Sequence, residues 1–121
     1  MATYEELREA LADYVEQAYK SKRVMRSLRH WNCMIYIEAI DLGCGYTMQI
    51  RDSQVTVHDG SNESPDLIVQ GNSEDLANIF WCDANPVSAY MQGVIKTQGP
   101  QDHVMRLDAV SLLIFLELNK Q

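Results

Sequence analysis

From Leu7 to Leu28, apolar residues recur every three or four positions, as they do along one face of an α-helix. Thr3 and Glu6 precede them with the spacing of a capping box, in which each side chain bonds the other residue's backbone N–H. The pattern predicts one long helix from this cap to about residue 29. Its apolar stripe consists of Leu7, Leu11, Tyr14, Val15, Ala18, Met25 and Leu28.

The pattern then changes to a period of two, which is typical of β-strands. Residues 33–40 are apolar on both alternating faces, so we expect a central strand covered on both sides for much of its length. Residues 46–51 and 54–58 follow as further strands, and Gly43-Cys44-Gly45 and Asp52-Ser53 supply the turns between them. Three antiparallel strands are therefore predicted.

Residues 85–99 combine a helix start, a helix stop and a strand. Asn85 can cap the helix through its side-chain oxygen, and Pro86 suits the first helical position because its missing N–H would be unpaired there. Gly93 can adopt the left-handed conformation that ends a helix. Residues 94–97 then continue as a β-branched strand.

The C-terminal segment predicts a helix that begins at Asp102 and is apolar on nearly every side. Seven of the nine residues from Val110 to Leu118 are apolar, which is more than one face can hold. The helix is too short to span a bilayer, so something must cover its second side. A bound apolar ligand, a partner chain and the other helices all remain open.

Composition favours one ordinary domain over residues 1–121, with 46% apolar and 22% charged residues. The net charge of −7 disfavours nucleic-acid partners, which require a concentrated basic face. The three cysteines show no C-x-x-C spacing, which indicates neither a disulfide framework nor a zinc site. The acidic start of the chain has no apolar signal-peptide core, so a cytoplasmic location is expected.

The sequence offers no catalytic constellation. His30, His58 and His103 are far apart and lack metal-ligand spacing, so each is expected to be a surface or hydrogen-bonded histidine. Asp108 is interpreted as a helix-surface carboxylate, and Ser88 lacks the context of a nucleophile elbow. We therefore expect no enzyme activity, no metal and no cofactor.

Three consecutive segments together resemble the sterol carrier protein 2 family of small lipid-binding domains. Residues 65–71 resemble the family's strand before a helix, Ser73 to Phe80 resemble that helix with Ser73 as its N-cap, and residues 85–99 resemble its signature. The chain departs from the family at Cys82-Asp83-Ala84, where members commonly carry a glycine and a basic residue.

The resemblance implies an α/β (α+β) fold, with a mixed five-stranded sheet, helices on one face and a hydrophobic tunnel between them. It implies non-catalytic binding, which could extend to transfer, of a fatty acid, fatty acyl-CoA, sterol, isoprenoid or phospholipid. Gln92 is the candidate polar anchor because an amide both donates and accepts hydrogen bonds. The candidate apolar wall, which the resemblance alone separates from ordinary core, is Phe80, Trp81, Tyr90, Met91, Leu107, Val110, Leu113 and Ile114.

Two other functions stay open. The apolar C-terminal helix could instead dock on a partner or a second copy, as in an accessory factor of isoprenoid-quinone biosynthesis. The chain could also be an enzyme or an enzyme's accessory domain, which predicts titratable residues converging in a pocket. Membrane contact is expected to be transient at most, through the basic end of the first helix, and a homodimer stays open.

Overall fold

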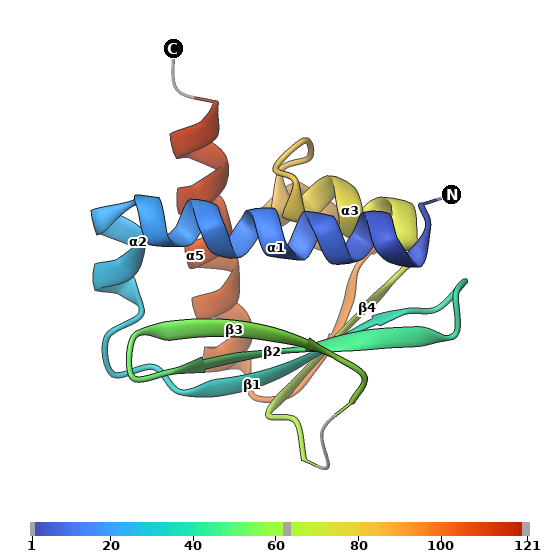
Figure 1. The fold of residues 1–121 in the computed structure, drawn as a ribbon, viewed down its shortest axis with the longest axis horizontal. Helices are drawn as coiled ribbons and strands as arrows, with labels where there is room; N and C mark the ends of the chain where they lie inside the picture. The colour runs from blue at the N-terminus through green and yellow to red at the C-terminus, as the bar shows by residue number, and fades with distance from the viewer. Residues whose placement is uncertain (1, 62–63, 120–121) are drawn as a thin grey trace.

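The computed structural model describes residues 2–61 and 64–119. A sheet forms one layer of the molecule, and the helices lie on one face of it, as predicted (Figure 1). The elements in chain order are α1 Tyr4–Lys20, α2 Lys22–Ser27, β1 Cys33–Ala39, β2 Cys44–Arg51, β3 Gln54–Asp59, β4 Leu67–Gly71, α3 Ser73–Phe80, α4 Pro86–Met91, β5 Lys96–Gln98 and α5 Gln101–Leu118.

The sheet has five strands in the order β3-β2-β1-β4-β5. β1 pairs in parallel with β4, and the other neighbours are antiparallel, so the predicted mixed sheet and the predicted meander of its first three strands are both confirmed. β1 is central, as expected. The prediction that both of its faces are covered for much of its length was wrong. Met34 and Tyr36 are only half-buried because every helix packs on the opposite face.

The predicted long N-terminal helix breaks in two at Ser21. The capping box at its start is confirmed, since Glu6 N–H donates to the Thr3 hydroxyl at 3.1 Å and Thr3 N–H donates to Glu6 at 3.0 Å. Ser21 is extended, with φ of −103° and ψ of 119°, and its hydroxyl accepts from Val24 N–H at 3.3 Å. Such a local side-chain bond offers the backbone an alternative to the helix, so α2 starts in a new direction.

Ser73 is not the cap of α3 but its first residue. Asn72 occupies the cap position without a side-chain bond, and the carboxylate of Asp41 takes over that role. It accepts from the Ser73 N–H at 2.8 Å and from the Ser73 hydroxyl at 2.7 Å. The Ser73 hydroxyl lowers the pKa of Asp41, because it stabilises the charged carboxylate.

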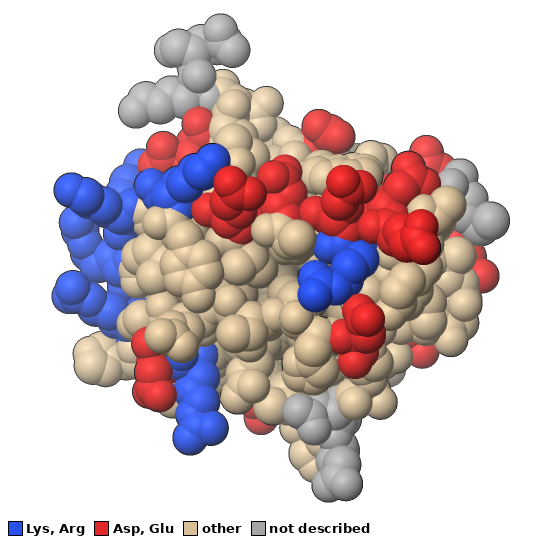
Figure 2. Space-filling model, viewed as in Figure 1, with Lys and Arg blue, Asp and Glu red and all other residues tan. Residues whose placement is uncertain are grey.

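Charge is segregated along the surface (Figure 2). Acidic residues follow α1, whereas basic residues gather at the end of the molecule where α2 lies. The exposed members of this basic end are Lys20, Lys22, Arg23, Arg26 and Arg29. Among the described helices, none has both the length and the apolar character needed to cross a membrane.

Candidate functional site

A cavity of about 30 Å³ lies between the β4–β5 edge of the sheet and the helices α3, α4 and α5. All but three of its lining residues are apolar or aromatic. The lining residues are Val69, Leu76, Ile79, Phe80, Pro86, Tyr90, Ile95, Thr97, Leu107, Asp108 and Ser111.

The strand and helix periods explain which side chains reach the cavity. Val69 on β4 and Thr97 on β5 are register partners, so their side chains point to the same face of the sheet. Leu76 and Phe80 are four residues apart on α3 and therefore lie above one another on one helix face. The same spacing relates Leu107 to Ser111 on α5.

The segment between α3 and β5 places α4 over the cavity. The Asn85 side chain accepts from the N–H groups of Val87 at 2.9 Å and Ser88 at 3.3 Å, so the predicted cap is confirmed. Pro86 occupies the start of α4, where it is buried in the cavity wall. Gly93 follows α4 with a φ of +78°, as expected of a helix stop. Cys82 also has a positive φ, +64°, a conformation that glycine adopts more readily than cysteine.

A buried hydrogen bond connects the cavity wall to α1. The hydroxyls of Tyr14 and Ser111 lie 2.7 Å apart, and both side chains are buried. The Tyr14 ring also packs edge-to-face on Phe80, with 5.0 Å between the ring centroids. Burial raises the pKa of Tyr14, so its hydroxyl stays protonated and holds Ser111 in place.

Asp108 brings a carboxylate into this mostly apolar wall. The side chain is partly buried, and the interpretation as a helix-surface carboxylate was wrong for that reason. Burial raises the pKa of Asp108 above its ordinary value because the charged form loses hydration. A pocket that is largely apolar and contains a few polar groups has the chemistry of a site for an apolar ligand.

The comparisons with known proteins identify the family. A model of the SCP-2 sterol transfer family matches residues 11–111. The chain belongs to this family. No curated protein matches the chain.

Solved structures share the SCP-2 fold. A protein described as UbiJ-SCP2 ubiquinone synthesis protein superposes with a TM-score of 0.71 at 14% identity, over 89% of this chain and 94% of that one. Palmitated SCP2L2 from Aedes aegypti has a TM-score of 0.66 at 20% identity, over 91% and 95% of the two chains.

The SCP-2 fold is also similar to part of a larger enzyme. The sec-alkylsulfatase Pisa1 from Pseudomonas sp. matches with a TM-score of 0.59 at 19% identity, over 72% of this chain. The match covers only 13% of the alkylsulfatase.

The structure brings three of the candidate wall residues of this SCP-2 domain together. Phe80, Tyr90 and Leu107 line the cavity. The remaining candidates lie outside it, and their contact with a ligand stays a prediction. Val110 and Ile114 are buried in the core, and Trp81 and Leu113 are partly buried.

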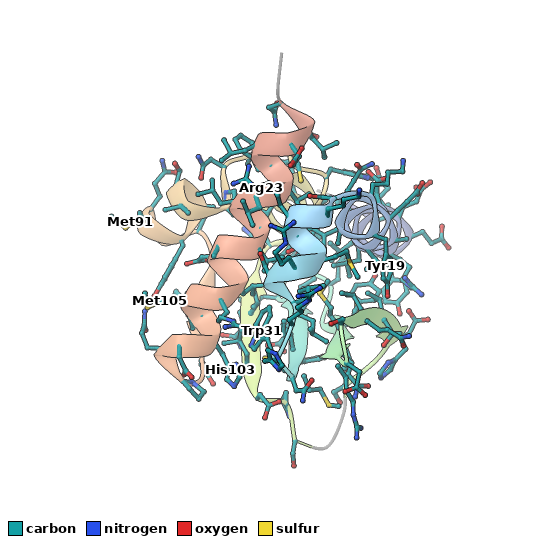
Figure 3. The ribbon with its side chains drawn as sticks, turned by 90° about the vertical axis from the view of Figure 1, so that its left-hand side faces the viewer. Tyr19, Arg23, Trp31, Met91, His103 and Met105 are labelled. Carbon is teal, nitrogen blue, oxygen red and sulfur yellow. The ribbon has the colours of Figure 1, made fainter. Side chains whose placement is uncertain are left out.

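Met91 and Gln92 point away from the cavity. Met91 is 82% exposed and extends outward from α4 (Figure 3). Gln92 is exposed and borders a separate depression with Asn85 and Ser88. Ala89 and Tyr90 lie on the inward side of α4, and the helical period of 3.6 residues turns the next two positions outward.

Several wall residues were not predicted, and some had a recognisable signal. Asp108 and Ser111 are polar residues three apart on a helix whose neighbours are apolar, which is the spacing of one shared face. Thr97 had no such signal, because its role depends on pairing with β4. The other missed residues are Val69, Leu76, Ile79, Pro86 and Ile95.

The histidines lie apart from the cavity and from one another in the described structure. The His103 ring accepts a hydrogen bond from the Trp31 N–H at 2.9 Å, as expected of a satisfied histidine, while His30 and His58 are exposed. Figure 3 shows Trp31 and His103 beside one another near the start of α5. In the part of the chain that the structure describes, no group of three His, Cys, Asp or Glu side chains could hold a metal ion.

Proposed function

We propose that this SCP-2 domain binds an apolar molecule, without catalysis, between the β4–β5 edge and helices α3, α4 and α5, and transfers it. The observation that carries the proposal is the apolar cavity in that position. Burial drives such binding, because removing a methylene group from water contributes about 0.8 kcal/mol. Fatty acyl-CoA, sterol, isoprenoid, phospholipid and fatty acid remain the candidate classes.

Ligand uptake requires the wall to move. A volume of about 30 Å³ holds about two water molecules, whereas pockets for larger ligands measure roughly 300–1,000 Å³. The shortest helix and the shortest strand of the cavity wall are best suited to give way: α4 has six residues and β5 has three. We therefore propose that α4 and β5 move away from α5 and extend the cavity into the tunnel that the family resemblance implies.

Native mass spectrometry of the purified protein, followed by solvent extraction of whatever dissociates, tests this function. The expected result is one lipid-sized molecule per chain, either retained from the host or acquired after incubation with 1-dodecanol. Absence of any adduct after incubation with dodecanol, dodecanoate and cholesterol would overturn the proposal.

A second candidate function is that of an accessory protein that docks through the C-terminal end of α5. The support for this function is that two apolar side chains at this end of α5, Leu116 and Leu118, are 54% and 43% exposed. A partner could cover them. This candidate predicts a dimer or a complex with a larger assembly. Size-exclusion chromatography with light scattering should then show a dimer that Leu116→Glu dissociates, and a monomer at every concentration would argue against self-association.

Contact with a membrane would involve the basic end of the molecule around α2. The cluster of lysines and arginines there is separated from the acidic face of α1 (Figure 2). Anionic lipid head groups attract such a cluster, but the net charge of −7 opposes tight adsorption of the whole protein. We propose transient contact during cargo exchange, in a protein whose cytoplasmic location stays a prediction.

A further inference from the structure

Asp108 carries the only carboxylate among the described residues that line the cavity. It precedes Ser111 by three positions, so the carboxylate shares a helix face with another wall residue. Position 108 is in the second turn of an 18-residue helix, beyond the first-turn positions where an acid complements the helix dipole. Helix stability therefore does not explain the acid.

Nothing in the described wall compensates this charge. No Lys, Arg or His is among the residues that line the cavity. Within residues 2–61 and 64–119, Asp108 forms neither an ion pair nor a side-chain hydrogen bond. Partial burial alone raises its pKa, and no neighbouring cation lowers it. A partly buried acceptor without a donor in the protein favours a ligand that supplies one.

The other two polar wall residues offer hydroxyls. The Ser111 hydroxyl is engaged with Tyr14 at 2.7 Å, so it is already satisfied. Thr97 lines the cavity from β5 and can donate to a ligand oxygen. A polar ligand end in this cavity would therefore meet one negatively charged acceptor and the Thr97 hydroxyl, in a wall to which Tyr90 adds a phenol.

We propose that Asp108 makes this cavity prefer apolar ligands with an uncharged hydroxyl end, such as long-chain, isoprenoid or sterol alcohols, over free fatty acids. The inference rests on the proposed function. A ligand hydroxyl donates to the Asp108 carboxylate and accepts from Thr97, which satisfies both groups. An ionised fatty-acid head brings a second negative charge toward Asp108, and like charges repel strongly where water is scarce.

A matched ligand pair tests the preference. The affinities of 1-dodecanol and dodecanoate are measured at pH 8 by displacement of the uncharged dye Nile red, and the acid-to-alcohol ratio of dissociation constants is compared between variants. Asp108→Asn removes the charge and keeps the shape. Asp102→Asn is the control, because Asp102 is exposed in the first turn of the same helix and does not line the cavity. Thermal unfolding checks that each variant is folded.

The ratio should fall at least about tenfold in Asp108→Asn, mainly through tighter binding of dodecanoate, and stay unchanged in Asp102→Asn. The change between variants is the diagnostic quantity, because any apolar site favours the alcohol to some degree. Equal ratios in the wild type and Asp108→Asn would overturn the inference and leave lipid binding intact. Failure of both ligands to displace the dye would overturn the proposed function as well.

Discussion

The hydroxyl groups of Tyr14 and Ser111 lie 2.7 Å apart in the interior and join α1 to α5. Ser111 also lines the cavity, so this bond fixes the position of one wall against the N-terminal helix. α5 crosses α1 at a steep angle (Figure 1), so the two helices meet over a short length and this bond lies where they meet. The bond is therefore expected to stabilise both the fold and the shape of the site.

Tyr14→Phe should destabilise the protein by about 1–3 kcal/mol, because it leaves the Ser111 hydroxyl buried without a partner. The ring contact with Phe80 survives the change, so the loss reports the hydroxyl. Urea unfolding of Tyr14→Phe, Ser111→Ala and the double variant measures the coupling. The double variant should cost less than the sum of the two single changes, whereas additive costs would show that the two hydroxyls do not interact.

Asp108→Asn should stabilise the protein at pH 7 by at most about 1 kcal/mol, or about 4 °C in melting temperature, because partial exposure to water screens the charge. Burial raises the pKa of Asp108 in the folded state, so the folded state holds this proton more tightly than the unfolded state. The contribution of Asp108 to stability is present below its ordinary pKa of about 4, and this contribution is lost as the pH rises through the pKa that Asp108 has in the folded state. The advantage of Asp108→Asn should thus grow between pH 3 and pH 7.

Thermal unfolding of the wild type and of Asp108→Asn between pH 3 and pH 7 checks the direction of this pH dependence. Tyr90 on α4 lines the same cavity as Asp108, and Tyr14 lies behind Ser111; both side chains are phenols, which do not change charge in this range. If Asp108→Asn were more stable than the wild type by the same amount at every pH, the difference in stability would not come from the Asp108 charge.

Amide hydrogen exchange should identify α4 and β5 as the mobile side of the cavity. β5 pairs with β4 over three positions and has no other neighbour in the described sheet, so its amides should exchange at least about tenfold faster than those of β1. Saturation with 1-dodecanol should slow exchange in α4 and β5. β3 is the control because it is the opposite edge of the sheet, and equal slowing of exchange there would contradict a local effect of the ligand on the cavity wall.

Local patterns in the sequence were sufficient for most of the fold. The capping box at Thr3 and Glu6, the cap at Asn85 and the strand alternation after Cys33 each depend on residues that are close in sequence. The break at Ser21 was missed because the apolar stripe continues across it. The cap of α3 was missed because its acceptor, Asp41, lies 32 residues away.

The cavity wall was less predictable because it is assembled from three helices and two strands. The family resemblance led to Phe80, Tyr90 and Leu107, which do line it. Apolar character alone could not distinguish the core residue Ile114 from a wall residue, since both are buried. Asp108 was assigned to the surface because an isolated acid on a helix usually faces water, and only the packing of α4 and β5 shows otherwise.

Filling the cavity tests the central claim most directly. Leu107→Trp adds bulk to the wall of the cavity, and Leu116→Trp makes the same change at a position on α5 that is 54% exposed. Thr97→Phe is a second filling variant on the half-buried edge strand, in case tryptophan at position 107 overpacks the core. Binding of 1-dodecanol to each folded variant is measured by displacement of Nile red. Lipid binding in this cavity predicts at least about tenfold weaker binding in the folded filling variants and unchanged binding in Leu116→Trp. Wild-type affinity in folded Leu107→Trp and Thr97→Phe would contradict it.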